Sequence, residues 1–147
     1  MPRKDQIHEA VKNALIKDGW TITDDPYRIE YEEADVYADL RIEKGNADGG
    51  AQRVLVIEIK EFTGVSPMHR LEQALGQYQV YRSYLRQIAP EEQLYLAVDK
   101  ASYDPLFSRK GRSMNKLFRF WPATKVAPDR STKSACADWN SYFDRRP

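Results

Sequence analysis

The sequence is poor in the residues that hold disulfide-rich or zinc-binding folds together. It contains one cysteine, Cys136, and two histidines, so an internal disulfide is excluded and no Cys/His cluster indicates structural zinc. No apolar run approaches the roughly 20 residues that a membrane helix needs, so no membrane association is expected. Residues 1–5 lack the apolar core of a signal peptide, and we expect a cytoplasmic location.

What is present fits one folded domain followed by a basic segment. A chain of 147 residues with 41% hydrophobic residues can bury one core. Residues 1–107 carry 13 Lys and Arg against 19 Asp and Glu, whereas residues 108–147 carry 10 against 3. A basic segment can bind phosphates, but on charge alone a solvated extension is the simpler interpretation. We therefore expect a domain over 1–107 and a divergent basic segment over 108–147, disordered or only partly structured.

Two helices are indicated by capping residues and apolar periodicity. The first is predicted to begin at the capping residue Asp5 and to end before Gly19. The second begins at Ser66 and Pro67 and ends before Pro90. The second helix carries an apolar stripe at Leu71, Ala74, Tyr78, Tyr81, Leu85 and Ile88.

Strands are predicted where β-branched and aromatic residues are bounded by turn residues, at 20–23, 27–31, 36–42, 54–60 and 94–98. The nearly continuous apolar run at 54–60 suits a central strand buried on both faces, and 36–42 should pair with it as a hairpin. A weaker strand is predicted at 116–121, with loop or disorder from Pro122 onward. The coarse order αβββαβ predicts an α/β (α+β) fold with a central mixed sheet flanked by helices.

Charged residues interrupt the aliphatic strand at its end. Glu58 and Lys60 are two residues apart, so both side chains project from the same face of the strand. Burying a lone charge is costly, and a strand end at a cleft would relieve that cost. Asp39, in the strand predicted to pair with 54–60, should bring a second carboxylate close to Glu58. A surface ion pair at a strand end is the alternative interpretation of Glu58 and Lys60.

Two close carboxylates repel each other, and a divalent cation relieves that repulsion. Asp39, Glu58 and the backbone carbonyl of Ile59 would offer the hard oxygen ligands that Mg²⁺ prefers, with Mn²⁺ as a substitute. Such an ion polarises a scissile phosphate and lowers the pKa of a bound water. Lys60 would orient the water or stabilise the charge that develops on the phosphate. The pattern therefore points to hydrolysis of a phosphodiester.

Three further residues are candidates for this site. Gln77 and Tyr81 are four residues apart on the second helix and so share a face. They would hold a nucleotide or the attacking water, although a core Tyr81 and an ordinary boundary Gln77 explain the same spacing. Glu9 of the first helix would support the site if it reached the cleft. A solvated helix position is the alternative for Glu9.

The order Asp39, Glu58-Ile59-Lys60 and Gln77-x-x-x-Tyr81 resembles the PD-(D/E)XK nucleases, in the branch that carries a Gln-x-x-x-Tyr helix. More narrowly, residues 1–107 resemble the XisH family, the element excision controlling factors of cyanobacteria, including that of the fdxN element. The matching stretches are residues 1–5, 8–23, 25–27, 56–60, 73–78 and 94–98. In that family the chain continues after position 107 into a helix and a final apolar strand, whereas here residues from Ser108 onward are basic and rich in proline.

The resemblance implies a restriction-endonuclease-like core and a role in site-specific excision of a DNA element. It implies catalytic roles for Asp39, Glu58, Lys60 and Gln77, and as partners DNA, a XisI-like companion protein and a site-specific recombinase. A homodimer is also expected. Two alternatives stay open: a non-catalytic accessory module that binds DNA or its companion, and one half of a toxin–antitoxin-like pair.

Overall fold

The computed structural model describes residues 3–62, 66–99 and 120–123. Its elements follow the order α1 (Arg3–Lys17), β1 (Thr21–Asp24), β2 (Tyr27–Tyr31), β3 (Ala34–Ala38), β4 (Leu40–Lys44), β5 (Arg53–Lys60), α2 (Pro67–Ile88), β6 (Gln93–Asp99) and β7 (Phe120–Ala123). None of the described helices is long and apolar enough to cross a membrane.

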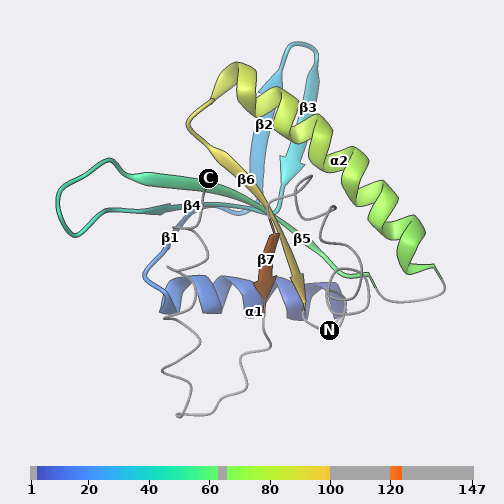
Figure 1. Cartoon of the computed structure of the whole chain (residues 1–147), viewed down its shortest axis with the longest axis horizontal. Helices are drawn as coiled ribbons and strands as arrows, with labels where there is room; N and C mark the ends of the chain where they lie inside the picture. The colour runs from blue at the N-terminus through green and yellow to red at the C-terminus, as the bar shows by residue number, and fades with distance from the viewer. Residues whose placement is uncertain (1–2, 63–65, 100–119, 124–147) are drawn as a thin grey trace, which may run out of the picture.

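A five-stranded mixed sheet in the order β1-β4-β5-β6-β7 forms the centre of the molecule (Figure 1). β1 pairs antiparallel with β4 and β4 antiparallel with β5, whereas β6 pairs in parallel with β5 and β7 in parallel with β6. The main-sheet strands and helices up to β6 follow the predicted αβββαβ order, so the α/β fold is confirmed. The apolar run of β5 lies between two strands and is buried on both faces, as its composition predicted.

Two helices cover opposite faces of this sheet (Figure 1). Alternate residues of β5 divide between them, because successive side chains on a strand point to opposite faces. Leu55 and Ile57 pack with Val11 and Leu15 of α1. Val56 packs with the buried stripe of α2, which consists of Leu71, Ala74, Tyr78, Tyr81 and Leu85.

The helix boundaries agree with some of the predicted caps and stops and differ from others. α1 begins at Arg3, so Asp5 lies inside the helix and its prediction as the cap was wrong. Gly19 adopts a φ of 88° immediately after the helix, and the N–H of Trp20 donates to the carbonyl of Leu15, which confirms the predicted stop. α2 begins after Ser66 as predicted. Ile88 is 44% exposed because the helix ends beside it, so its place in the buried stripe was wrong.

The chain changes sheets at Asp39. The predicted strand 36–42 is split there: β3 pairs antiparallel with β2 in a separate two-stranded sheet, and β4 pairs with β5 in the main sheet. Leu40 is the first residue of β4 and lies opposite Ile57. β5 therefore extends three residues beyond its last partner in β4, and Asp39 lies at the point where that pairing ends.

The structure describes only four residues of the basic segment 108–147. The strand predicted at 116–121 overlaps β7, Phe120–Ala123, at its last two residues, and 116–119 lie outside the described ranges; β7 pairs in parallel with β6. Pro122 lies within β7, so the prediction of loop from that residue onward was wrong at this point. β7 has one neighbour in the described sheet, and a strand at a sheet edge tolerates the missing N–H of proline. The other residues of the segment lie outside the described ranges.

Candidate active site

Glu58 and Lys60 lie at the C-terminal end of β5, on the face of the sheet that α2 covers. The Nζ of Lys60 lies 3.2 Å from Oε1 of Glu58, so the predicted juxtaposition of the two charges is observed. Glu58 is only 6% exposed, whereas Lys60 is partly exposed. The carboxylate is therefore held within the protein, while the amine is partly accessible to solvent.

Asp39 makes two hydrogen bonds to this end of β5. Its backbone N–H donates to Oε2 of Glu58 over 3.2 Å. Its own Oδ2 accepts the N–H of Ile59 over 2.7 Å. The bend between β3 and β4 thus brings the Asp39 carboxylate beside β5 at the residue that follows Glu58, where a continuing β4 would otherwise have supplied the acceptor.

α2 adds a chain of hydrogen bonds that ends on Glu58. The amide Nε2 of Gln77 donates to Oε1 of Glu58 over 3.2 Å and to the hydroxyl of Tyr81 over 2.8 Å. The Tyr81 hydroxyl in turn donates to the backbone carbonyl of Tyr37 over 2.9 Å. Gln77 and Tyr81 therefore join the site, and they connect Glu58 to the segment that carries Asp39.

Burial dominates the electrostatics of the candidate active site, which consists of Asp39, Glu58, Lys60, Gln77 and Tyr81. The pKa of Glu58 is raised to about 7, chiefly by burial and also by the nearby Asp39 carboxylate, while Lys60 lowers it. Burial likewise raises the pKa of the Tyr81 hydroxyl, against the hydrogen bond from Gln77. A carboxyl group that resists ionisation beside a second carboxylate is one that a divalent cation would stabilise in its charged form.

The donor set fits a hard cation better than zinc. Ile59 directs its N–H to Asp39, and because the N–H and carbonyl of a strand residue point to the same side, its carbonyl faces that side too. Asp39, Glu58 and this carbonyl are all oxygen donors, as Mg²⁺ requires. Within residues 3–62, 66–99 and 120–123, no three His, Cys, Asp or Glu side chains gather into a metal-binding group. A bound ion would therefore keep several waters or substrate oxygens as ligands.

Glu9 is not brought to the centre by any described contact. It is exposed on α1, which packs on the other face of the sheet, and its carboxylate lies 3.7 Å from Nζ of Lys12. His8 and Lys12 both contact Asp25, at 2.8 Å and 2.7 Å. These contacts fasten α1 to the turn after β1, and the supporting role expected for Glu9 stays a prediction.

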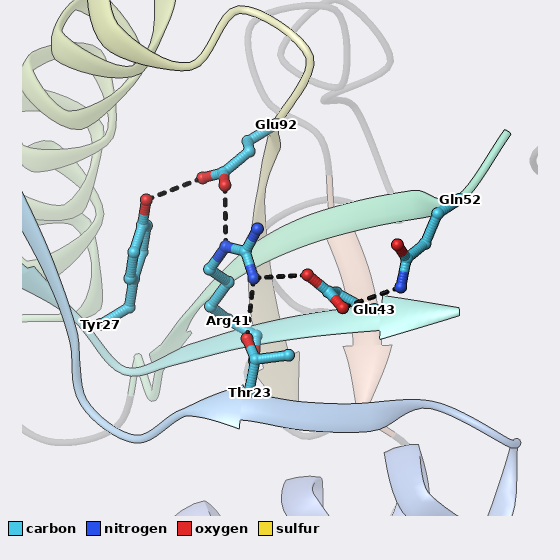
Figure 2. A network of polar contacts seen from close by, with 6 residues as sticks. All are labelled: Thr23, Tyr27, Arg41, Glu43, Gln52 and Glu92. Atoms are coloured by element: carbon cyan, nitrogen blue, oxygen red, sulfur yellow. Dashed lines mark hydrogen bonds and ion pairs between the residues drawn. The ribbon is translucent and has the colours of Figure 1, made fainter. Parts of the chain in front are cut away.

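A second polar network was not predicted from the sequence. Arg41 donates through Nε to Glu92 over 2.7 Å and through Nη1 to Glu43 and Thr23, and the hydroxyl of Tyr27 donates to Glu92 over 2.9 Å (Figure 2). Burial and the Glu92 carboxylate raise the pKa of Tyr27 to about 12. The network fastens the α2–β6 connection to β2 and β4. Its members come from separate elements, so no local spacing could have indicated it.

Comparison with known proteins identifies relatives of this chain. A family model described as "XisH protein" matches residues 1–117. The fold is similar to the crystal structure of an fdxN element excision controlling factor protein from Anabaena variabilis, with 34% identity, a TM-score of 0.66, and coverage of 76% of this chain and 83% of that one. An XisH family protein from Nostoc punctiforme is similar at 34% identity and a TM-score of 0.64, covering 75% and 82%. No curated protein matches.

Proposed function

This chain belongs to the XisH family, and from that membership we propose that it acts as an element excision controlling factor that hydrolyses a DNA phosphodiester with Mg²⁺. One observation supports the nuclease part of the proposal above all others. The end of β5 presents a buried carboxylate, Glu58, with the Lys60 amine 3.2 Å away and Asp39 hydrogen-bonded to both Glu58 and Ile59.

Each residue has a distinct task in this proposal. Asp39, Glu58 and the carbonyl of Ile59 would hold the ion, which would polarise the scissile phosphate and lower the pKa of a nearby water. Lys60 would hold its positive charge where negative charge develops on the phosphate. Gln77 would fix the orientation of the Glu58 carboxylate. Mn²⁺ would replace Mg²⁺ with the same ligands.

The proposed role in element excision rests on the description of a similar protein. The protein similar to this chain from Anabaena variabilis is described as an fdxN element excision controlling factor. From the resemblance to the XisH family, we propose DNA, a XisI-like companion and a site-specific recombinase as partners of this chain. The nuclease centre would supply a strand break during excision, and the companion and the recombinase would determine where and when it is made.

A second candidate function is a non-catalytic module that binds DNA or its companion. The contacts of Glu58 support this second function. Asp39 and Gln77 donate hydrogen bonds to its carboxylate oxygens and Lys60 forms an ion pair with it, so the carboxylate already has partners without a metal ion. A protein without catalytic activity could keep this arrangement as a structural junction. The toxin–antitoxin interpretation stays a prediction.

A nicking assay separates the two functions. The protein is incubated with supercoiled DNA and Mg²⁺ or Mn²⁺, with and without the companion, beside Lys60→Ala and the exposed control Lys17→Ala. Metal-dependent nicking that Lys60→Ala abolishes and Lys17→Ala retains would support the nuclease. Intact DNA together with tight binding of the companion would refute it and favour the binding module.

A further inference from the structure

The outward face of α2 has no described partner. Its exposed residues recur at spacings of three and four, which is the spacing of a helix–helix contact seam. We call this set the α2 seam: Gln73, Gly76, Val80, Ser83 and Gln87. It lies opposite the buried stripe that packs on the sheet, and none of the described residues covers it.

Gly76 is the least expected member of the α2 seam. Glycine weakens the middle of a helix, and here a Cβ added at position 76 would meet nothing within 4 Å. Neither a positive φ nor a close contact within the described chain therefore explains it. Val80, one turn further along, is 43% exposed. A small residue beside an exposed aliphatic one allows a second helix to approach closely.

The charges of α2 indicate what kind of molecule fits the seam. Residues 73–81 contain no charged residue, which is poor for binding a phosphate backbone but typical of the centre of a protein interface. Glu72, Gln79 and Arg86 follow one edge of the seam, each one heptad from the next. Glu72 lies 4.0 Å from His69, and within the described part of the chain Arg86 has no ion pair.

That edge is complementary to itself when reversed. If a second α2 lies antiparallel with its two-fold axis at Gln79, each Glu72 lies opposite Arg86 of the other copy, because both residues are seven positions from the axis. The neutral Gln79 then meets its own copy. A parallel pair in register would instead place identical residues side by side.

We propose that the α2 seam is a homodimer interface in which two copies of this chain pair their α2 helices in antiparallel orientation. This proposal does not depend on nuclease activity, because it involves none of the side chains that contact Glu58. It gives the expected homodimer a specific surface and geometry.

Charge exchange across the axis is the direct test. The full chain and its variants are compared by sedimentation equilibrium over a wide concentration range, with thermal unfolding as a check that each variant folds. Glu72→Arg and Arg86→Glu should each weaken the dimer about tenfold, since each removes two opposite-charge contacts and creates two like-charge ones. The double variant should return to near the wild-type affinity. Glu91→Arg, an equal charge change beyond the end of α2, should have no effect.

Steric obstruction provides a second, independent measurement. Gly76→Leu should leave folding intact, since position 76 is open within the chain, and should weaken the dimer. A wild-type chain that is monomeric at every concentration would overturn the proposal. So would a dimer that the double charge variant fails to restore. Variants that change DNA binding without changing the oligomeric state would show that the seam is a nucleic-acid surface instead.

Discussion

Glu58→Gln tests the buried carboxylate through the pH dependence of folding. The pKa of Glu58 is raised from its ordinary 4.5 to about 7 in the native protein, chiefly by burial. The native state therefore holds the Glu58 proton more tightly than the unfolded chain does. The stability that this group contributes is fully present below pH 4.5 and is lost as the pH rises to about 7. At about 1.4 kcal/mol per pKa unit, the whole loss amounts to about 3 kcal/mol.

The assay is urea unfolding of the metal-free protein at about pH 5 and about pH 8.5, a range that spans most of this titration. The wild type should lose about 2.5 kcal/mol more than Glu58→Gln between the two conditions, because the other titrating groups are common to both proteins. Comparing differences removes any constant cost of placing an amide beside the donors from Asp39 and Gln77.

A matched control and a ligand experiment sharpen this prediction. Glu91→Gln changes an exposed carboxyl and should keep the wild-type pH dependence. Excess Mg²⁺ should reduce the loss of stability at high pH in the wild type, because the ion favours the charged form of Glu58. Identical pH dependence in wild type and Glu58→Gln would refute the reasoning, since it would mean that Glu58 titrates normally.

Three further substitutions test the roles of Tyr81 and Asp39 in the candidate site and of Glu92 in the Arg41 network. Tyr81→Phe keeps the buried ring but removes the hydroxyl that donates to Tyr37, and it should lower Mg²⁺ affinity measured by calorimetry about tenfold with little change in the fold. Asp39→Asn should abolish measurable Mg²⁺ binding in the same experiment; unchanged binding would exclude Asp39 as a ligand. Glu92→Gln removes a charged partner of Arg41 and should cost about 2 kcal/mol in urea unfolding, whereas a loss within error of zero would show that the network is dispensable.

The part of the centre that could be predicted depends on short-range periodicity. Glu58 and Lys60 were found because a period of two places them on one face, and Gln77 and Tyr81 because a period of four does so on a helix. These relations hold whatever the tertiary arrangement, because they depend only on the local backbone geometry of a strand or a helix. The αβββαβ order of the elements and the hairpin of β4 with β5 could likewise be predicted, from apolar runs bounded by turn residues.

Asp39 shows what the sequence could not provide. Residues 36–42 alternate without interruption, so nothing local indicates that the strand breaks there. The break arises because residues 34–38 pair with β2 rather than with the main sheet, and that choice depends on contacts between distant segments. The Arg41–Glu92 network depends on such contacts too. Long-range pairing, rather than local propensity, therefore sets both the exact position of the carboxylate and the connections around it.

The bend at Asp39 also determines where the chain can change in length. The turn between β2 and β3, where Glu32 has a φ of 53°, lies far from the centre along the hairpin, and an added residue there would be absorbed by the loop. One residue added between Ala38 and Leu40 would instead move the Asp39 amide and carboxylate out of step with Glu58 and Ile59. Related chains should therefore vary in length at the tip of this hairpin and keep a fixed spacing at its base.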